Sequence, residues 1–310
     1  MTGPLRFDDR VVIITGGSRG IGRELAEQYA HLGARVVVNG RDAAKVEQAA
    51  AEIGENAFGV AADIADPAAA NTLVERTLEQ FGRLDIVINN AGILGFSPLA
   101  QMTDQVFDDM WGANLRGAFN VTRAAWPHLT ERGYGRVIVT PSHGIFGAPD
   151  SAHYALAKAA LVGMMRALSL EGAPLGITVN AVLPFAITEM VMQAMASGPG
   201  VVDEGSDLAA AAPYLQPSMV WPAVAWLTHH DSDVTGEILT LGGGRVARVF
   251  LAETTGYHDP NLTPESVRDN WKRVCAEDGY TTPGDHTESL MKVIAALQAP
   301  TGASHQEGNT

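Results

Sequence analysis

The chain has 310 residues, 46% of them hydrophobic and 18% charged, so it can bury a sizeable core. Its net charge of −14 argues against a nucleic-acid-binding surface, which needs clustered Lys and Arg. No apolar run is long enough to span a membrane, and the single cysteine, Cys275, is expected to be a buried structural thiol.

Short apolar segments alternate with longer segments of helical periodicity. The expected strands are Val11–Thr15, Arg35–Asn39, Ala57–Ala61, Leu84–Ile88, Arg136–Thr140, Ile177–Val182 and Glu237–Leu241. The expected helices are Gly20–Leu32, Ala43–Ile53, Pro67–Phe81, Asp104–Arg132 (as one helix or two) and Ala152–Glu171. Because most apolar runs are continuous, their strands should be buried on both faces of a parallel sheet. The pattern predicts an α/β fold: a single Rossmann-type, doubly wound parallel sheet with helices on both faces.

The predicted organisation is one main domain followed by an extension. Residues 7–244 are expected to form the dinucleotide-binding and catalytic domain. Within it, Phe185–Pro217 is long for a connection and is expected to be a lid, the alternative being a surface loop packed on its own Met side chains. Residues 245–298 should form a C-terminal extension packed on the same domain, and residues 299–310 a disordered tail.

A glycine-rich turn follows the first strand and opens the first helix. It reads Thr15-Gly16-Gly17-Ser18-Arg19-Gly20-Ile21-Gly22. Glycines in this context let the backbone approach a pyrophosphate at a helix N-terminus, although such a turn can also be purely structural. The residues of the turn expected to contact the cofactor are Gly16, Ser18, Arg19, Gly20 and Ile21.

The end of the second strand indicates which cofactor is bound. Gly40 follows Asn39 where an acidic side chain would bind the ribose of NAD. Arg41, together with Arg19, can instead pair with a 2′-phosphate, while Asp42 lies past the strand end. We therefore expect NADP(H), with NAD(H) the less favoured choice. The alternative for Arg41 is an ordinary solvated surface charge.

Further cofactor contacts are expected after the third and fourth strands. Asp63, followed by Ile64, is placed to accept a hydrogen bond from the adenine amino group, the alternative being a plain turn. Asn90, Ala91 and Gly92 follow the fourth strand. Small residues there let a cofactor lie close to the backbone.

Tyr154 and Lys158 are four positions apart on a predicted helix and therefore share one face. A phenol with a pKa near ~10 is a poor base, but a neighbouring ammonium favours the phenolate. Proton and hydride transfer can then occur at one carbon–oxygen unit. A Tyr-x-x-x-Lys pair alone is common, so the prediction depends on the other motifs.

Taken together, the motifs resemble those of the short-chain dehydrogenase/reductase family. The matching positions, in the family's order, are Gly16, Gly20, Gly22, Asp63, Asn89 to Gly92, Asn114, Tyr154, Lys158, Pro184 and Thr188. The resemblance implies that Tyr154 is the acid/base, that Lys158 binds the nicotinamide ribose and lowers the pKa of Tyr154, and that Asn114 holds a water in a proton relay. It also implies that Thr188 and the backbone near Ile187 hold the carboxamide. The remaining residues expected to contact the cofactor are Asn39, Ile64, Tyr154, Lys158, Pro184, Ile187 and Thr188.

A closer resemblance is to the (3R)-hydroxyacyl-CoA dehydrogenase units of the type 2 peroxisomal multifunctional enzymes. It is carried by Val36-Val37-Val38-Asn39, Asn114-Leu115-Arg116-Gly117, Val121–Trp126 and the tail segment Leu262–Trp271. Ordinary short members of the family end near Gly244 and lack this tail. The resemblance implies a 3-oxoacyl or 3-hydroxyacyl thioester as the substrate, with a small ketone as the alternative.

One departure from the family concerns its catalytic serine, which lies thirteen residues before Tyr154, where this chain has Pro141. On a regular strand, a shift by one residue would turn a side chain to the opposite face. Because Pro141 sits at the end of the predicted strand, we expect the backbone to bend and present Ser142. Thr140, His143 or no substitute at all are the alternatives.

The expected function is that of an NADP(H)-dependent oxidoreductase interconverting a ketone and a secondary alcohol. Pro141 favours the alternative, an NADP(H)-binding member with impaired catalysis that acts as a sensor or subunit, whereas the retained Asn114, Tyr154 and Lys158 favour the enzyme. No metal site is expected.

The resemblance also implies a homodimer or homotetramer, with contacts between the helices of Asp104–Arg132 and Ala152–Glu171. The tail from Arg245 is expected to cover a neighbouring subunit or the substrate pocket of its own chain. The first residues lack a secretory signal pattern and the last three match no peroxisomal tripeptide, so the expected location is the cytoplasm.

Overall fold

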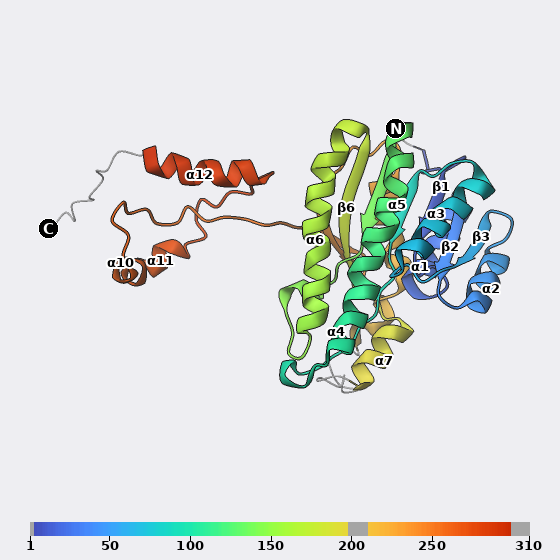
Figure 1. The fold of residues 1–310 in the computed structure, drawn as a ribbon, viewed down its shortest axis with the longest axis horizontal. Coiled ribbons are helices and arrows are strands. Elements are labelled where there is room, and N and C mark those ends of the chain that lie inside the picture. Colours follow the sequence, from blue (N-terminus) through green and yellow to red (C-terminus); the bar gives the residue numbers. More distant parts are fainter. Residues whose placement is uncertain (1–2, 198–209, 299–310) are drawn as a thin grey trace. The chain divides into compact units, whose positions relative to one another are not determined.

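The computed structural model describes residues 3–197 and 210–298 of the chain (Figure 1). The chain divides into two compact units, Met1–Val249 and Phe250–Thr310. The predicted disordered tail, 299–310, lies outside the described residues.

An eight-stranded sheet forms the centre of the first unit, in the order β3-β2-β1-β4-β5-β6-β7-β8. Seven strands are parallel, and β8 is antiparallel to β7. The strands are β1 Val11–Ile14, β2 Arg35–Gly40, β3 Ala57–Ala61, β4 Ile86–Asn89, β5 Gly135–Val139, β6 Ile177–Pro184, β7 Ile238–Gly242 and β8 Arg245–Val249. Because the strand order reverses between β1 and β4, a crevice for ligands is expected at their carboxyl ends. The predicted doubly wound fold is confirmed.

Helices cover both faces of this sheet. The helices of the first unit are α1 Gly20–His31, α2 Ala43–Ile53, α3 Pro67–Phe81, α4 Asp104–Trp111, α5 Gly117–Arg132, α6 Ala152–Gly172, α7 Glu189–Ser197 and α9 Trp221–Thr228. Consecutive residues of β1 belong to the two hydrophobic cores on opposite faces of the sheet. Ile13 shares one core with Leu73 of α3 and Leu161 of α6. Ile14 shares the other core with Leu25 of α1 and Val224 of α9. The strands β1, β2, β4, β5 and β6 are thus mostly buried on both sides, as their continuous apolar sequences predicted, whereas β3 and β7 are only partly buried.

Two predicted segments are resolved in more detail by the structure. The segment predicted as one helix or two, Asp104–Arg132, forms α4 and α5 joined by a π-helical turn, Gly112–Arg116. The predicted lid, Phe185–Pro217, includes α7, while residues 198–209 lie outside the described part of the chain. The lid therefore stays a prediction.

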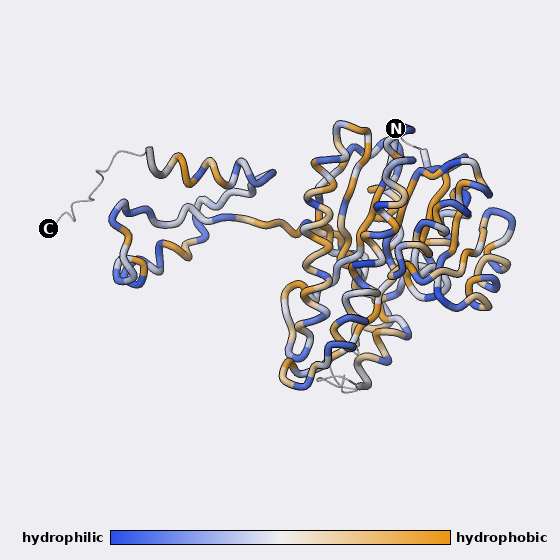
Figure 2. Tube along the Cα trace, in the orientation of Figure 1, coloured by the Kyte–Doolittle hydropathy of each residue, from blue (hydrophilic) through white to orange (hydrophobic). Residues whose placement is uncertain are grey.

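Hydropathy follows this layering. Figure 2 shows hydrophobic residues along the strands of the first unit, whereas its helices and loops carry many hydrophilic ones. None of the helices in the described part of the chain is long and apolar enough to cross a membrane.

The second unit contains three helices within its described residues, α10 Pro264–Asp269, α11 Trp271–Val274 and α12 His286–Gln298. α10 begins at a capping box in which the Thr263 side chain accepts from the Ser266 N–H and the Ser266 hydroxyl accepts from the Thr263 N–H. Lys292 Nζ of α12 donates to Glu253 at 2.7 Å. Cys275 is exposed, so the expectation of a buried thiol was wrong. The packing of this extension on the main domain stays a prediction.

Candidate functional site

The glycine-rich turn joins β1 to α1 at the carboxyl edge of the sheet. Gly16 and Gly20 have φ angles of +64° and +55°, which glycine adopts without strain. A Cβ on Gly22 would lie 2.2 Å from the Gly16 carbonyl oxygen, so the close contact between the start of α1 and the turn requires glycine at this position. Ile21 anchors the turn by packing against the core shared with α1. The turn therefore brings the N–H groups of the first turn of α1 to the crevice, as a pyrophosphate requires.

Gly40, at the end of β2, lies beside the turn. A Cβ on Gly40 would come within 3.3 Å of the Ser18 hydroxyl oxygen, so the glycine gives that hydroxyl room. The next carboxylate, Asp42, is occupied as the N-cap of α2, where it accepts a hydrogen bond from the Lys45 N–H at 3.2 Å. Asp42 is thus committed to the helix, in agreement with its predicted position past the strand end.

The two arginines predicted to recognise a 2′-phosphate, Arg19 and Arg41, are both exposed. Arg19 Nη1 lies 4.0 Å from a carboxylate oxygen of Glu189 in α7, with both side chains more than half exposed. Such an exposed pair is screened by water and contributes little. Arg19 is therefore available to exchange this contact for a phosphate.

The turn after β4 is held by Thr15. Its hydroxyl accepts hydrogen bonds from the N–H groups of Asn90 and Ala91, both at 3.0 Å. Asn90 Nδ2 donates back to the carbonyls of Thr15 and Gly16 at 3.1 and 3.4 Å. The predicted residues Asn90 and Ala91 are thereby fixed against the glycine-rich turn. Thr15 was not predicted as a site residue, and its only signal was its place between β1 and the first glycine.

Three other predicted cofactor residues differ in how they are held. Asn39 is buried, and its Nδ2 donates to two backbone carbonyls at the end of β3, both at 3.1 Å, so it links β2 to β3. Ile64 is 6% exposed and belongs to the core. Asp63 is exposed, with one carboxylate oxygen accepting from the Ala65 N–H at 3.1 Å. Of the three, Asp63 alone presents a polar group to solvent.

The segment after β6 closes the other side of the crevice. β6 ends at Pro184, and the Ile187 N–H donates to the Leu215 carbonyl at 2.7 Å. A Cβ on Gly20 would lie 3.3 Å from Thr188 Cγ2. The predicted carboxamide-binding segment is therefore in direct reach of the glycine-rich turn.

Tyr154 and Lys158 share a buried face of α6, with 8% and 5% exposure. Lys158 Nζ donates to the Thr140 carbonyl at 2.9 Å and lies 5.8 Å from the centre of the Tyr154 ring. Burial lowers the pKa of Lys158 to about 8. Burial also raises the pKa of Tyr154, and a hydrogen bond with Ser142 opposes that rise. Burial thus outweighs the effect of Ser142, the pKa of Tyr154 lies above its ordinary value, and the phenol keeps its proton at neutral pH.

The chain beyond β5 brings Ser142 to Tyr154. Pro141 is buried, and the backbone is still extended at Ser142 (φ −164°, ψ 163°) before a 3-10 helix begins at His143. The Ser142 side chain accepts from the Gly144 N–H at 3.2 Å, and a Cβ on Gly144 would lie 3.7 Å from Ser142 Oγ and 2.7 Å from Tyr154 Cε1. The hydroxyl displaced by one position therefore lies near the Tyr154 ring, and its role as the substitute stays a prediction.

The alternatives to Ser142 have other contacts. His143 Nε2 lies 2.8 Å from Thr240 Oγ1 of β7, and its ring meets Phe185 edge-on at 5.7 Å. Thr140 is buried, and its carbonyl binds Lys158. The geometry favours Ser142 over both.

Asn114 lies in the π-helical turn between α4 and α5, a geometry common at functional sites. Its side chain is buried and fixed: Nδ2 donates to the carbonyls of Ile93 and Met110, both at 3.0 Å, and Oδ1 accepts from the Ile93 N–H at 3.2 Å. A Cβ on Gly92 would lie 2.4 Å from Asn114 Oδ1 and 3.1 Å from Lys158 Nζ. Gly92 therefore lets Asn114 and Lys158 come together.

The residues present fit a nicotinamide dinucleotide. Gly16 and Gly20 adopt positive φ, and a Cβ on Gly92 would collide with Asn114 Oδ1 and come within 3.1 Å of Lys158 Nζ, so these positions require glycine. Lys158 would hold the ribose beside the nicotinamide, and the turn before α1 the pyrophosphate.

Residues 10–198 match the family described as short chain dehydrogenase. Peroxisomal multifunctional enzyme type 2 of Mus musculus is 33% identical over 96% of this chain and 41% of its own length. The 3-oxoacyl-[acyl-carrier-protein] reductase of Escherichia coli is 32% identical over 77% of this chain and 98% of its own length. The chain spans less than half of the mouse enzyme and 66% of peroxisomal multifunctional enzyme A of Dictyostelium discoideum.

Two solved structures are similar over the whole fold. The full-length peroxisomal multifunctional enzyme type 2 of Drosophila melanogaster aligns with a TM-score of 0.78 and 27% identity, covering 95% of this chain and 50% of that one. The 3-ketoacyl-(acyl-carrier-protein) reductase of Brucella melitensis, complexed with NADH, aligns with a TM-score of 0.71 and 33% identity, covering 77% and 98%.

These relatives correct one prediction. The expected cytoplasmic location is contradicted, because the mouse and Dictyostelium relatives, and the hydratase-dehydrogenase-epimerases of Saccharomyces cerevisiae and Neurospora crassa, are named peroxisomal enzymes. The prediction rested on two absences, that of a secretory signal pattern and that of a peroxisomal tripeptide, and such absences are weak signals for location.

The match over residues 10–198, the relatives at 32% and 33% identity and the shared fold agree with the geometry of the crevice. The chain belongs to the short-chain dehydrogenase family and is an oxidoreductase of that class.

Proposed function

We propose that the chain is an NADP(H)-dependent oxidoreductase that interconverts a 3-oxoacyl and a 3-hydroxyacyl thioester. The observation that carries this proposal is the placement of Ser142 beside Tyr154. A Cβ on Gly144 would lie 3.7 Å from Ser142 Oγ and 2.7 Å from Tyr154 Cε1, so a hydroxyl stands near the phenol ring despite Pro141. The names of the E. coli and Brucella relatives, a 3-oxoacyl- and a 3-ketoacyl-(acyl-carrier-protein) reductase, support an acyl thioester as the substrate. Bound nicotinamide supplies or accepts the hydride.

The side chains around Tyr154 have distinct roles in this proposal. Ser142 and Tyr154 hold the substrate oxygen through their hydroxyls, and Tyr154 gives its proton to that oxygen during reduction. The raised pKa of Tyr154 suits this role, because the phenol is protonated before reaction. Lys158 carries positive charge near the ring and stabilises the phenolate that remains. Asn114 positions a water that returns the proton.

The proposed activity is tested by following NADPH absorbance with 3-oxoacyl-CoA thioesters, diketones and small ketones. Turnover is expected to be fastest with the thioesters. A chain that binds NADPH but turns over no member of the panel would support the alternative of a cofactor-binding protein with impaired catalysis.

NADPH is expected to bind more tightly than NADH, by about tenfold or more, since a charge-assisted contact to phosphate contributes about 1.5–3 kcal/mol. Gly40 carries no carboxylate, Asp42 is held as the N-cap of α2, and Arg19 and Arg41 are exposed. Arg41→Asp should reverse the order of the affinities. Fluorescence titration of both cofactors measures this.

The control for that titration is Arg76→Asp, which makes the same charge change on α3, where Arg76 lies 3.6 Å from Glu79. It should leave the cofactor preference unchanged. Equal affinities of the wild-type chain for NADPH and NADH would contradict the assignment.

A homodimer or homotetramer is proposed from the surface of α4, α5 and α6. An apolar groove there is lined by Trp111, Leu115, Phe119, Met164 and Leu168. Phe119 is 47% exposed, which costs free energy unless a partner covers it. Phe119→Asp is therefore expected to yield a smaller species in light scattering at micromolar concentration. Tyr280→Asp, which changes an exposed ring of the second unit, should not, and a monomeric wild type would refute the assembly.

A further inference from the structure

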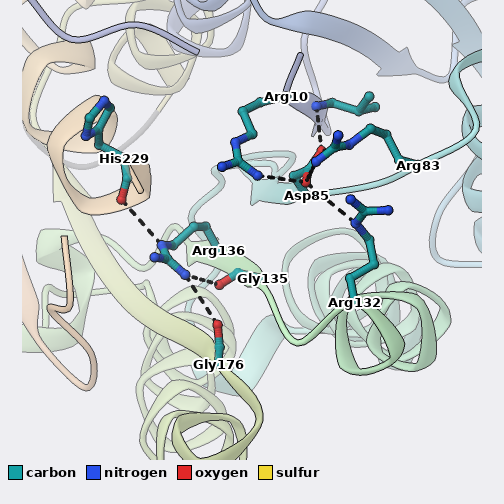
Figure 3. A network of polar contacts seen from close by, with 9 residues as sticks. Arg10, Arg83, Asp85, Arg132, Gly135, Arg136, Gly176 and His229 are labelled. Atoms are coloured by element: carbon teal, nitrogen blue, oxygen red, sulfur yellow. Dashed lines mark hydrogen bonds and ion pairs between the residues drawn. The ribbon is translucent and has the colours of Figure 1, made fainter. Parts of the chain in front are cut away.

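A second polar cluster lies at the amino ends of the strands, on the edge of the sheet opposite the crevice. Asp85 immediately precedes β4, and its side chain is completely buried. Three arginines from different parts of the chain converge on it: Arg10 before β1, Arg83 two residues upstream, and Arg132 at the end of α5 (Figure 3).

The contacts that Asp85 makes with these three arginines differ in number and in distance. Its Oδ2 accepts from the Val11 N–H at 2.9 Å and from Arg83 Nε at 2.8 Å, and its Oδ1 accepts from Arg83 Nη2 at 2.6 Å. Arg10 Nη1 and Arg132 Nε lie farther from Oδ1, at 3.3 and 3.8 Å. Only Arg83 is bidentate. Because each guanidinium has five N–H donors, Arg10 and Arg132 retain donors that this carboxylate cannot accept.

A fourth guanidinium increases the positive charge. Arg136 is 6% exposed and donates to the backbone carbonyls of Gly135, Gly176, His229 and Ser232, which carry no formal charge. The Tyr134 ring lies between two guanidiniums, with the central carbons of Arg10 and Arg136 each 4.3 Å from its centre. The Tyr134 hydroxyl is buried and has no hydrogen-bond partner within the described part of the chain.

The acidic groups near the cluster do not balance these charges. Besides Asp85, the carboxylate of Asp9 attracts the Arg83 guanidinium and helps to raise its pKa. Asp231, on the side of Arg136, faces the rings of His229 and His230 at 3.4 and 3.2 Å. Four arginines therefore outnumber the carboxylates around them, in a chain whose net charge is −14. Because Arg10, Arg83 and Arg132 share the one carboxylate of Asp85, their positive charge is only partly offset, and an anion would reduce the remaining cost.

We propose that Arg10 and Arg132, which both face Asp85 Oδ1, form a site for a phosphate group, either inorganic phosphate or a phosphate monoester. The side chains of Arg10 and Arg132 are 27% and 37% exposed, so a ligand reaches them from solvent. Planar guanidiniums match phosphate oxygens in pairs. The site is separate from the glycine-rich turn, so it does not depend on the proposed function.

The test is thermal unfolding of the full chain with saturating NADP⁺, so that phosphate cannot act at the glycine-rich turn. Phosphate replaces chloride at constant ionic strength, which removes general screening. A ligand that binds only the folded chain raises Tm, here by about 2–4 °C at saturation. Arg132→Gln should lose this rise, and it should fold because the contact it breaks is long. Arg76→Gln, at an arginine with a 52% exposed side chain on α3, should retain it.

The other outcomes are equally informative. The same Tm rise in Arg132→Gln and the wild type would mean an adventitious ion only and would overturn the site, as would no rise in the wild type. Glycerol phosphate acting like inorganic phosphate identifies monoesters as the ligand class, and a response to inorganic phosphate alone identifies the free ion. If Arg132→Gln does not fold, Arg132→Lys keeps the charge without the planar fork, and calorimetric titration should show weaker phosphate binding than in the wild type.

Discussion

Tyr154→Phe is expected to lower kcat by about 10²–10⁴-fold, the range for losing a positioned acid or base. The substitution removes the proton that the substrate oxygen must receive, but it keeps the aromatic ring that packs against Gly144. The affinity for NADPH should therefore be unchanged. Steady-state turnover and a fluorescence titration of NADPH separate the two effects.

The matched control is Tyr280→Phe, which removes the hydroxyl of a half-exposed tyrosine in the second unit. It should leave both kcat and cofactor affinity at wild-type values. If Tyr154→Phe kept most of the wild-type kcat, another group would have to be the acid, and our assignment would fail.

Ser142→Ala is expected to lower kcat by about 10²-fold or more, the effect of removing one donor aimed at a developing charge. It should also shift the pH profile. The hydrogen bond from Ser142 lowers the pKa of Tyr154, so its loss raises that pKa further. Alcohol oxidation needs the phenolate, and its rate should therefore rise only at higher pH than in the wild type. A purely structural role for Ser142 would leave this profile in place.

Pro141→Ser is the complementary experiment. If Ser142 already serves as the hydroxyl donor, restoring the family residue should change kcat little, or lower it by disturbing the buried position of Pro141. If the wild-type chain is impaired, the same substitution should raise kcat strongly. A large gain would therefore defeat the proposal that Ser142 is the substitute.

Most of the sheet could be predicted because its strands are continuous apolar runs. One strand and one helix of the first unit, β8 and α9, were not predicted, and each has a physical reason. β8 is an edge strand whose Arg245 and Arg248 interrupt the apolar pattern, and α9 is a short helix that is apolar on nearly every side, so it shows no helical period. Both were missed, and β8 carries the first unit past residue 244 to Val249.

The site was predictable as a set of residues but not as a geometry. Tyr154 and Lys158 follow from their spacing on α6, since helical periodicity fixes a shared face. Whether Ser142 could reach Tyr154 depended on backbone angles after β5 that no residue pattern specifies. Arg83 lies next to Asp85 in the chain, but Arg10 and Arg132 meet Asp85 only through the order of the strands.

The π-helical turn at Gly112–Arg116 has a consequence for tolerance to insertions and deletions. A π-bulge arises from one extra residue inserted into an α-helix, so it shifts the phase of everything that follows. Val121, Ala125 and Leu129 face the core at this shifted phase. Removing one residue from the turn would rotate this stripe by about 100° relative to α4. The chain could then keep either the position of Asn114 or the buried face of α5, but not both. The length of this turn is therefore fixed jointly by the site and by the core.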